Sequence, residues 1–188
     1  MFLTLGPSVL CGVYFTFVST ASFFYQEQLH LSITDFALHQ GCVLAGFSVI
    51  SVLTGKINKA LGMGQSIRYG NFLTIIGAVV LLLLGFYPVG YPYTITAFMT
   101  LHAMGIALSF GTTVAIAFNV KPEMAGSSSS LIMASRLFFC SAMVAYASKV
   151  YDGTWLSVST ILVIGGAAGC LLIARGLAIS KSPLLKKS

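Results

Sequence analysis

The chain has 188 residues, of which 57% are hydrophobic and only 7% are charged, with a formal net charge of +6. Soluble domains carry about 25% charged residues, so a chain this apolar could not cover its own surface with polar side chains. Its basic residues form short patches between apolar runs rather than a stripe interleaved with aromatic residues, which argues against nucleic-acid binding. The composition therefore predicts an integral membrane protein whose main partner is the lipid bilayer.

Six apolar stretches are long enough to cross a membrane as helices, which takes roughly 20 residues each. They cover residues 2–24, 36–54, 71–88, 93–118, 127–148 and 155–175. The predicted fold class is therefore all-α: a bundle of six transmembrane helices over residues 1–176, followed by a basic cytoplasmic tail at 177–188. Short connections between the stretches suit antiparallel neighbours.

The connections carry helix-cap and turn signals. "LSITDF" offers Ser32 or Thr34 as the N-cap of the second helix, with Asp35 in its first turn. "YPVGYPY" (Tyr87–Tyr93) and "KPEMAGSSSS" (Lys121–Ser130) combine proline with glycine, as turns do.

The distribution of lysine and arginine predicts the orientation. One side of the predicted membrane holds eight basic residues: Lys56, Lys59, Arg68, Lys121, Arg175, Lys181, Lys186 and Lys187. The other side holds Lys149 alone, together with three of the acidic residues. Because cytoplasmic loops carry an excess of basic residues, we predict that the first side and both termini are cytoplasmic.

Three segments carry a family resemblance: "GKINKALGMGQSIRYG" (residues 55–70), "SFFYQEQLHLSITDF" (residues 22–36) and "PEMAGSSSSL" (residues 122–131). Together they resemble the bicyclomycin-resistance (Bcr/CflA-type) drug exporters of the major facilitator superfamily. "GKINKALGMGQSIRYG" is similar to the cytoplasmic loop after that family's eighth helix, through the spacing of Gly55, Lys56, Lys59, Leu61, Gly62, Arg68 and Gly70. "SFFYQEQLHLSITDF" (residues 22–36) resembles the turn between helices seven and eight. "PEMAGSSSSL" (residues 122–131) resembles the start of helix eleven.

The resemblance implies that the chain corresponds to the C-terminal half of a twelve-helix transporter, built from two inverted three-helix units. It implies a secondary active antiporter in the inner (plasma) membrane that exports small-molecule substrates, gives drug resistance and has protons as a candidate coupling ion. Such a half would need a complementary N-terminal half, or a second copy, to enclose a cavity. Two alternatives stay open: an inactive remnant of a split exporter gene, and a membrane scaffold that transports nothing.

Arg136 departs from the family pattern, which commonly has an uncharged polar residue there. It lies nine residues after Ser127, about 13–14 Å along a helix and near the middle of a ~30 Å hydrocarbon core. An arginine at this depth normally faces a bundle interior or an aqueous cavity and finds a partner, unless it reaches back to cytoplasmic water. The chain's four acids all lie in loops or at helix ends: Glu27, Asp35, Glu123 and Asp152. Candidate partners are then backbone carbonyls, the hydroxyls of Ser109 and Thr112, or a group outside the chain.

The remaining candidates are weaker. His102 also falls near mid-membrane and is either a hydrogen-bonded core histidine or a group that contacts substrate or protons. Tyr14 and Gln26 are cavity candidates through the resemblance alone. Gly165 and Gly169 have the spacing of a close helix contact, which we expect within the chain rather than in a dimer.

No Walker motif, Ser/His/Asp set or metal-ligand spacing occurs in the sequence. The four cysteines all lie inside apolar stretches and are predicted to be small core residues. We therefore predict no enzyme, no metal and no cofactor.

Overall fold

The computed structural model describes residues 2–86, 91–120 and 125–179, without the side chains of residues 117–120, 125, 127 and 128. The described residues form six long α-helices and one short π-helical segment, and no β-strand occurs among them. These elements are α1 (Phe2–Phe23), η1 (Phe24–Gln28), α2 (Ile33–Leu61), α3 (Met63–Gly85), α4 (Pro92–Val120), α5 (Ala125–Val150) and α6 (Trp155–Ile179). All six helices are long and apolar enough to cross a membrane, which confirms the all-α membrane class.

The helices run further than the apolar stretches that predict them. α2 starts after its predicted N-cap Ser32, whose Oγ accepts a 3.1 Å hydrogen bond from the amide of Asp35. The polar segment predicted as a loop over residues 55–70 is helical except at Gly62, which has a positive φ of 81°. Helical backbone satisfies its own hydrogen bonds, so it continues beyond the apolar span until a residue such as glycine permits the turn. Residues 87–90 and 121–124 of the two predicted turns lie outside the described residues, as does the tail beyond Ile179. The prediction is wrong at residues 125–130, including Gly126, because α5 already begins at Ala125.

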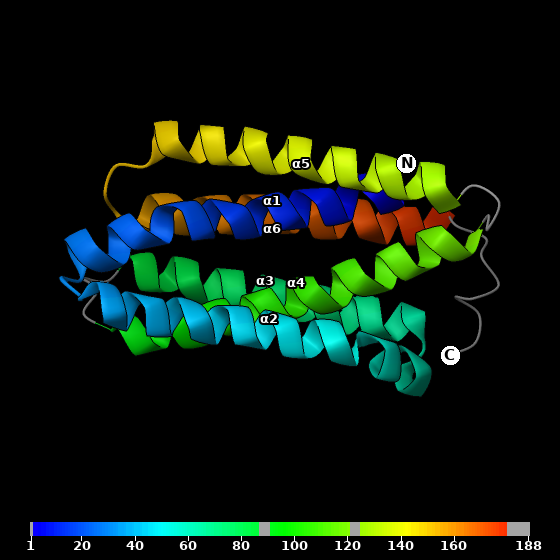
Figure 1. Cartoon of the computed structure of the whole chain (residues 1–188), viewed down its shortest axis with the longest axis horizontal. Helices are drawn as coiled ribbons and strands as arrows, with labels where there is room; N and C mark the ends of the chain where they lie inside the picture. Colours follow the sequence, from blue (N-terminus) through cyan, green and yellow to red (C-terminus); the bar gives the residue numbers. More distant parts are fainter. Residues whose placement is uncertain (1, 87–90, 121–124, 180–188) are drawn as a thin grey trace.

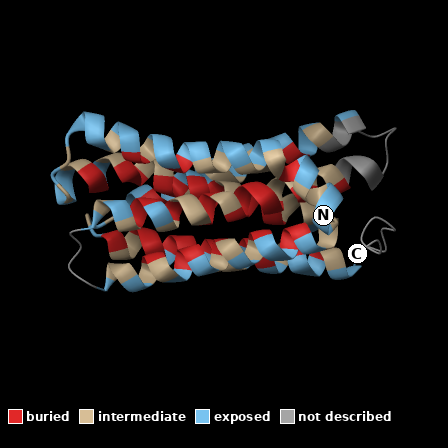
Figure 2. Ribbon diagram, turned by 90° about the horizontal axis from the view of Figure 1, so that it is seen from below, coloured by how far each residue is buried: buried red, intermediate tan, exposed pale blue. Residues whose placement is uncertain are grey.

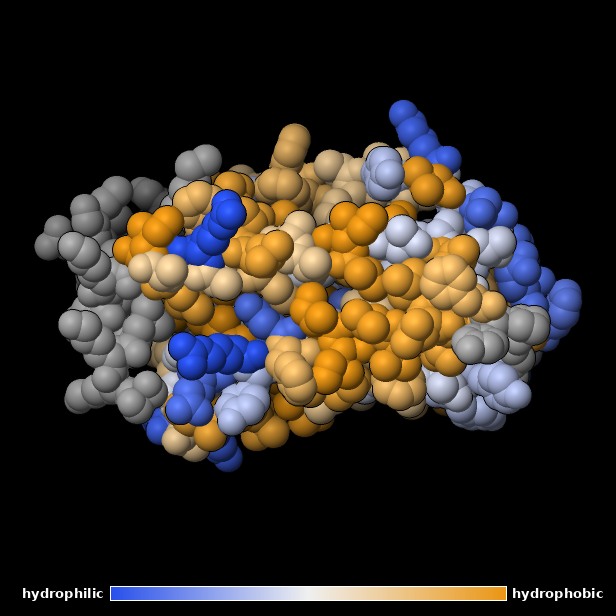
Figure 3. Space-filling model, turned by 180° about the vertical axis from the view of Figure 1, so that it is seen from behind, coloured by the Kyte–Doolittle hydropathy of each residue, from blue (hydrophilic) through white to orange (hydrophobic). Residues whose placement is uncertain are grey.

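All helices run roughly along one axis, and consecutive helices point in opposite directions (Figure 1). The start of α1, the break between α2 and α3, and the end of α6 lie at one end of the bundle. Exposed basic residues of this end are Lys56, Lys59, Arg68 and Arg175. In Figure 3 a hydrophobic surface covers the middle of one face, and hydrophilic residues gather toward its ends. This is the surface expected of a bundle that contacts lipid around its middle.

The packing joins two consecutive units of three helices, α1–α3 and α4–α6. α1 packs mainly against α5 and α6, and α4 packs mainly against α2 and α3. α1 also contacts α4, and α3 contacts α6. The two units therefore pack in equivalent ways: the first helix of each unit, α1 or α4, packs against the second and third helices of the other unit. The first helices contact each other, and so do the third helices, α3 and α6. The short connections predict that helices consecutive in the chain pack side by side as antiparallel neighbours. Among the described helices, only the consecutive pair α3 and α4 packs extensively.

Glycines allow the closest of these approaches. A Cβ placed on Gly169 would lie 2.6 Å from Cδ2 of Leu10, and one on Gly165 would lie 2.5 Å from Cγ2 of Val13. Both glycines of the predicted pair therefore lie against α1, inside the chain's own core. The equivalent interface between α3 and α4 is also tight, at Gly77 and elsewhere.

Burial differs sharply between helices. Within the most apolar 18 residues of each helix, 56% are buried in the α1–η1 span and 61% in α4, but only 6% in α2 and 11% in α5. Figure 2 shows the buried residues gathered along the inside of the bundle. α2 thus packs on one side of the central helix α4, and α5 packs on one side of the central helix α1. Most of the surface of α2 and of α5 has no partner among the described residues.

Candidate functional site

A cavity of about 370 Å³ lies between the two central helices and the two exposed ones. Its lining comes from α1, α2, α4 and α5: Cys11, Tyr14, Phe15, Leu44, Phe47, Ser51, Ile106, Ala107, Phe110, Gly111 and Arg136. Arg136 lies eleven residues after the first residue of α5, about 17 Å along the helix. Arg136 and the cavity wall that it forms therefore lie near the middle of α5; the mid-membrane position of Arg136 stays a prediction.

Arg136 is half-buried at the wall of this cavity. Its Cζ lies 5.6 Å from the centroid of the Phe110 ring, within the range of a cation–π contact. The guanidinium also lies close to the thiols of Cys11 and Cys140. Among the residues that the structure describes, it has no ion pair and no hydrogen bond to an oxygen.

The described carboxylates lie away from the cavity: Asp35 and Asp152 accept hydrogen bonds at the ends of helices, and Glu27 is exposed in η1. Ser32 Oγ donates a 2.7 Å hydrogen bond to Asp35 Oδ2. Asp152 Oδ1 accepts hydrogen bonds from the amide of Thr154 at 3.0 Å and from its hydroxyl at 2.7 Å, and these bonds lower the pKa of the Asp152 carboxyl. Glu123 lies outside the described residues. The cavity thus contains a cation and no described anion.

Aromatic rings make up much of the remaining wall. Tyr14, a candidate through the resemblance, stacks on Phe47 of α2 with ring centroids 5.3 Å apart and an interplanar angle of 24°. Phe15 and Phe110 complete the aromatic lining. Sequence reasoning missed the three phenylalanines, because nothing in an apolar stretch distinguishes a ring that faces a cavity from one that faces lipid.

Ser109 and Thr112, proposed as partners of Arg136, bond elsewhere. Ser109 Oγ donates to Asn71 Oδ1 of α3, and Thr112 Oγ1 donates to Asn58 Oδ1 of α2, each at 2.8 Å. Both hydroxyls are fully buried and join α4 to its neighbours. Their role in the described structure is to hold helices together.

His102 is fully buried where α4 packs on α3 and does not line the cavity. Its Nδ1 lies 2.8 Å from the carbonyl oxygen of Thr74, so Nδ1 carries the proton and donates it. Nε2 has no hydrogen-bond partner among the described residues. Gly77 lies against the histidine backbone. The arrangement is that of a neutral core histidine.

Gln26 and the segment over residues 55–70, with its basic residues Lys56, Lys59 and Arg68, lie at opposite ends of the bundle and do not line the cavity. Gln26 is in η1 and is partly exposed. Near Gln26 the structure also contains a buried cluster that sequence reasoning missed, in which Thr96 Oγ1 lies 2.8 Å from both Tyr25 Oη and His39 Nδ1. The cluster ties η1, α2 and α4 together.

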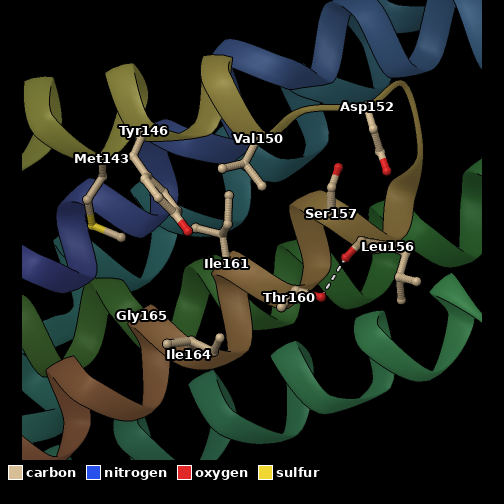
Figure 4. A pocket seen from close by; sticks show the side chains of 10 residues that line it. All are labelled: Met143, Tyr146, Val150, Asp152, Leu156, Ser157, Thr160, Ile161, Ile164 and Gly165. Atoms are coloured by element: carbon tan, nitrogen blue, oxygen red, sulfur yellow. Dashed lines mark hydrogen bonds between the residues drawn. The ribbon is translucent and has the colours of Figure 1, made fainter.

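A second hollow, of about 410 Å³, lies between α5 and α6 near the end that bears Lys149 (Figure 4). Its walls are mainly apolar, with Met143, Ile161 and Ile164 among them. Thr160 Oγ1 is already bonded to the carbonyl oxygen of Leu156, at 2.7 Å. Its one charged lining residue, Asp152, is fully exposed to solvent. This hollow is therefore a weaker candidate for a binding site than the cavity at Arg136.

No family model, curated protein or solved structure matches the chain. The class that the fold defines is a polytopic α-helical membrane protein with a cation-bearing cavity between its helices.

Proposed function

We propose that the chain is one six-helix half of a secondary active transporter of the major facilitator type, which exports small molecules. The observation that carries the proposal is the exchange of packing partners between α1–α3 and α4–α6. Transporters built from inverted repeats place their substrate site near the membrane midplane, where the repeats meet. Two observations support the Arg136 cavity as this site: the first and second helices of each unit line it, and Arg136 lies near the middle of α5.

The proposed transporter needs a second half. α2 and α5 are the least buried helices, and the cavity lies beside both of them. A second bundle that packs against α2 and α5 would close the cavity. The two bundles could then rock against each other, as alternating access requires. A separate chain, a second copy or a preceding part of a longer protein could supply this bundle.

Proton coupling, if this exporter uses it, needs a group that titrates in the transport path. The described cavity lining contains no carboxylate and no imidazole. His102 is enclosed between helices, and the described acids lie at helix ends. The proposal therefore assigns the proton-binding carboxylates to the second half.

Cellular accumulation of drugs tests the function. Expressed alone, the chain should leave accumulation equal to that of cells with an empty vector. Co-expression with a cognate N-terminal half should lower it. Association with that half without any change in accumulation would favour the scaffold or the inactive remnant, and efflux by the chain alone with a cross-linked dimer would favour two copies.

Orientation is a separate part of the proposal. Reporter fusions after Lys59, after Glu123 and at the C-terminus should all give a cytoplasmic signal, because the basic residues cluster at that end. A periplasmic signal at any of the three would overturn the proposed topology.

A further inference from the structure

The charge of the cavity limits what it can bind. Arg136 is the one charged residue in its described lining, and none of the described carboxylates (Glu27, Asp35 and Asp152) lines the cavity. An arginine is always protonated in proteins, so the cavity keeps a positive charge at any physiological pH. A cationic ligand would meet this charge with no described anion to offset it.

The contacts of Arg136 leave its hydrogen-bonding capacity largely unused. The Phe110 ring attracts the charge but is not an oxygen acceptor, and the neighbouring thiols of Cys11 and Cys140 are weak acceptors. A guanidinium has five N–H donors in a planar fork that matches a carboxylate. An anion that accepts two parallel hydrogen bonds, such as a carboxylate, would use these donors.

The rest of the lining is rich in aromatic side chains, which favours an anion that also carries an aromatic ring system. Tyr14 and Phe47 form a stacked pair in the same cavity, and its volume of about 370 Å³ is within the range of pockets that hold drug-sized ligands. We propose that the substrates are amphipathic aromatic carboxylates, with the carboxylate bound to Arg136 and the ring system packed against Tyr14 and Phe47. This inference rests on the proposed transport function.

Binding to the full chain in lipid nanodiscs tests this with three matched probes: 2-naphthoate, the neutral 2-naphthamide and the cationic 2-naphthylmethylammonium. We expect the wild-type chain to bind naphthoate at least about tenfold more tightly than either analogue, since a charge-assisted hydrogen bond contributes a factor of that order. Arg136→Gln should remove this preference and leave naphthamide binding unchanged. Arg136→Lys, which keeps the charge but loses the fork, should be intermediate. Arg175→Gln, an exposed arginine on α6, is the control.

Cys11 provides a second measurement inside the same cavity. In a chain with Cys42→Ser, Cys140→Ser and Cys170→Ser, a sulfonate-bearing methanethiosulfonate reagent should modify Cys11 faster than its trimethylammonium counterpart. Arg136→Gln should abolish the difference, and naphthoate should protect the thiol.

Equal affinity for the three naphthyl probes, an unchanged preference in Arg136→Gln, or a Cys11 that reacts with neither reagent would overturn the inference. These results are independent of transport. Export of neutral or cationic drugs with a second half, without Arg136-dependent naphthoate binding, would retain the function and reject the substrate class. Arg136-dependent binding without export by any pair of halves would do the reverse.

Discussion

Arg136 and His102 each lie well inside a long apolar helix, eleven residues after the start of α5 and ten after the start of α4, but their surroundings are opposite. His102 is fully enclosed between helices, with Nδ1 bonded to a carbonyl and a glycine against its backbone. Arg136 is half-buried at a cavity and contacts an aromatic ring and thiols rather than an oxygen acceptor. The distance from the start of the helix is similar for the two residues, but His102 faces a helix–helix contact and Arg136 faces a cavity.

The difference separates packing from binding. A polar group in the core contributes to stability through one fixed partner, so its loss should weaken the fold. A polar group at a cavity has donors to spare, so its loss should weaken ligand binding and leave the fold intact. The following predictions test this separation, beginning with the largest effect.

Enlarging the core beside His102 should prevent folding. A Cβ on Gly77 would lie 2.8 Å from His102 Cβ and 3.0 Å from its Cα, so Gly77→Leu forces α3 and α4 apart. Overpacking typically costs 1–3 kcal/mol, and more is expected here because backbone must move. Size-exclusion chromatography of a fluorescent fusion should show aggregated protein. Gly41→Leu is the control, since nothing lies within 4 Å of that position, and its peak should stay monodisperse. A monodisperse Gly77→Leu would contradict the tight α3–α4 contact.

Neutralising Arg136 should ease insertion while it weakens binding. An arginine at a helix centre costs about 2.5–3.5 kcal/mol on insertion scales, so Arg136→Gln should insert at least as well as wild type. Glycosylation-based insertion assays and the melting temperature in detergent measure the two quantities. Weaker export, or weaker association with the second half, is expected in the same variant. If Arg136→Gln and Arg136→Lys both match wild type in these functions, Arg136 only reaches toward water and has no functional role.

Replacing His102 should have the opposite signature. His102→Leu removes the hydrogen bond to Thr74, which we expect to lower the free energy of unfolding by about 1–3 kcal/mol. Titration with SDS measures this loss. Naphthoate affinity of the folded fraction should stay within twofold of wild type, because His102 does not line the cavity. A selective loss of binding without destabilisation would instead place His102 in the transport path.

The fold class was accessible from the sequence because span length and hydrophobicity are summed over whole helices. Single strong signals were also accessible: Ser32 caps α2, and Gly165 and Gly169 lie against α1 as a close-packing pattern predicts. The length of α2 was not, since Lys56 and Lys59 were interpreted as loop residues although lysine is a good helix former. Helix pairing was equally inaccessible, because it depends on which faces meet.

The site was predicted only where the chemistry is unusual. A charge within an apolar stretch identifies Arg136, but Phe47 and Phe110 are apolar residues among many others. The partners of Ser109 and Thr112 could not be foreseen, because Asn58 lies in the segment predicted as a loop and Asn71 is only the first residue of the next predicted span.

The smallest effects should come from those two hydroxyls. Ser109→Ala and Thr112→Val each remove one donor to an asparagine, and interhelical hydrogen bonds in membranes average about 0.6 kcal/mol with a maximum near 1.7. We therefore expect the free energy of unfolding, measured by SDS titration, to fall by about that amount. Naphthoate affinity should not change, since neither hydroxyl lines the cavity and neither is bonded to Arg136. Ser51→Ala is the matched control: Ser51 does line the cavity, but its Oγ bonds only to the carbonyl of Phe47 within its own helix, so its removal should leave stability unchanged. If Ser109→Ala or Thr112→Val instead lowers naphthoate affinity as much as Arg136→Gln does, these hydroxyls belong to the binding site, and the separation between core and cavity on α4 would fail.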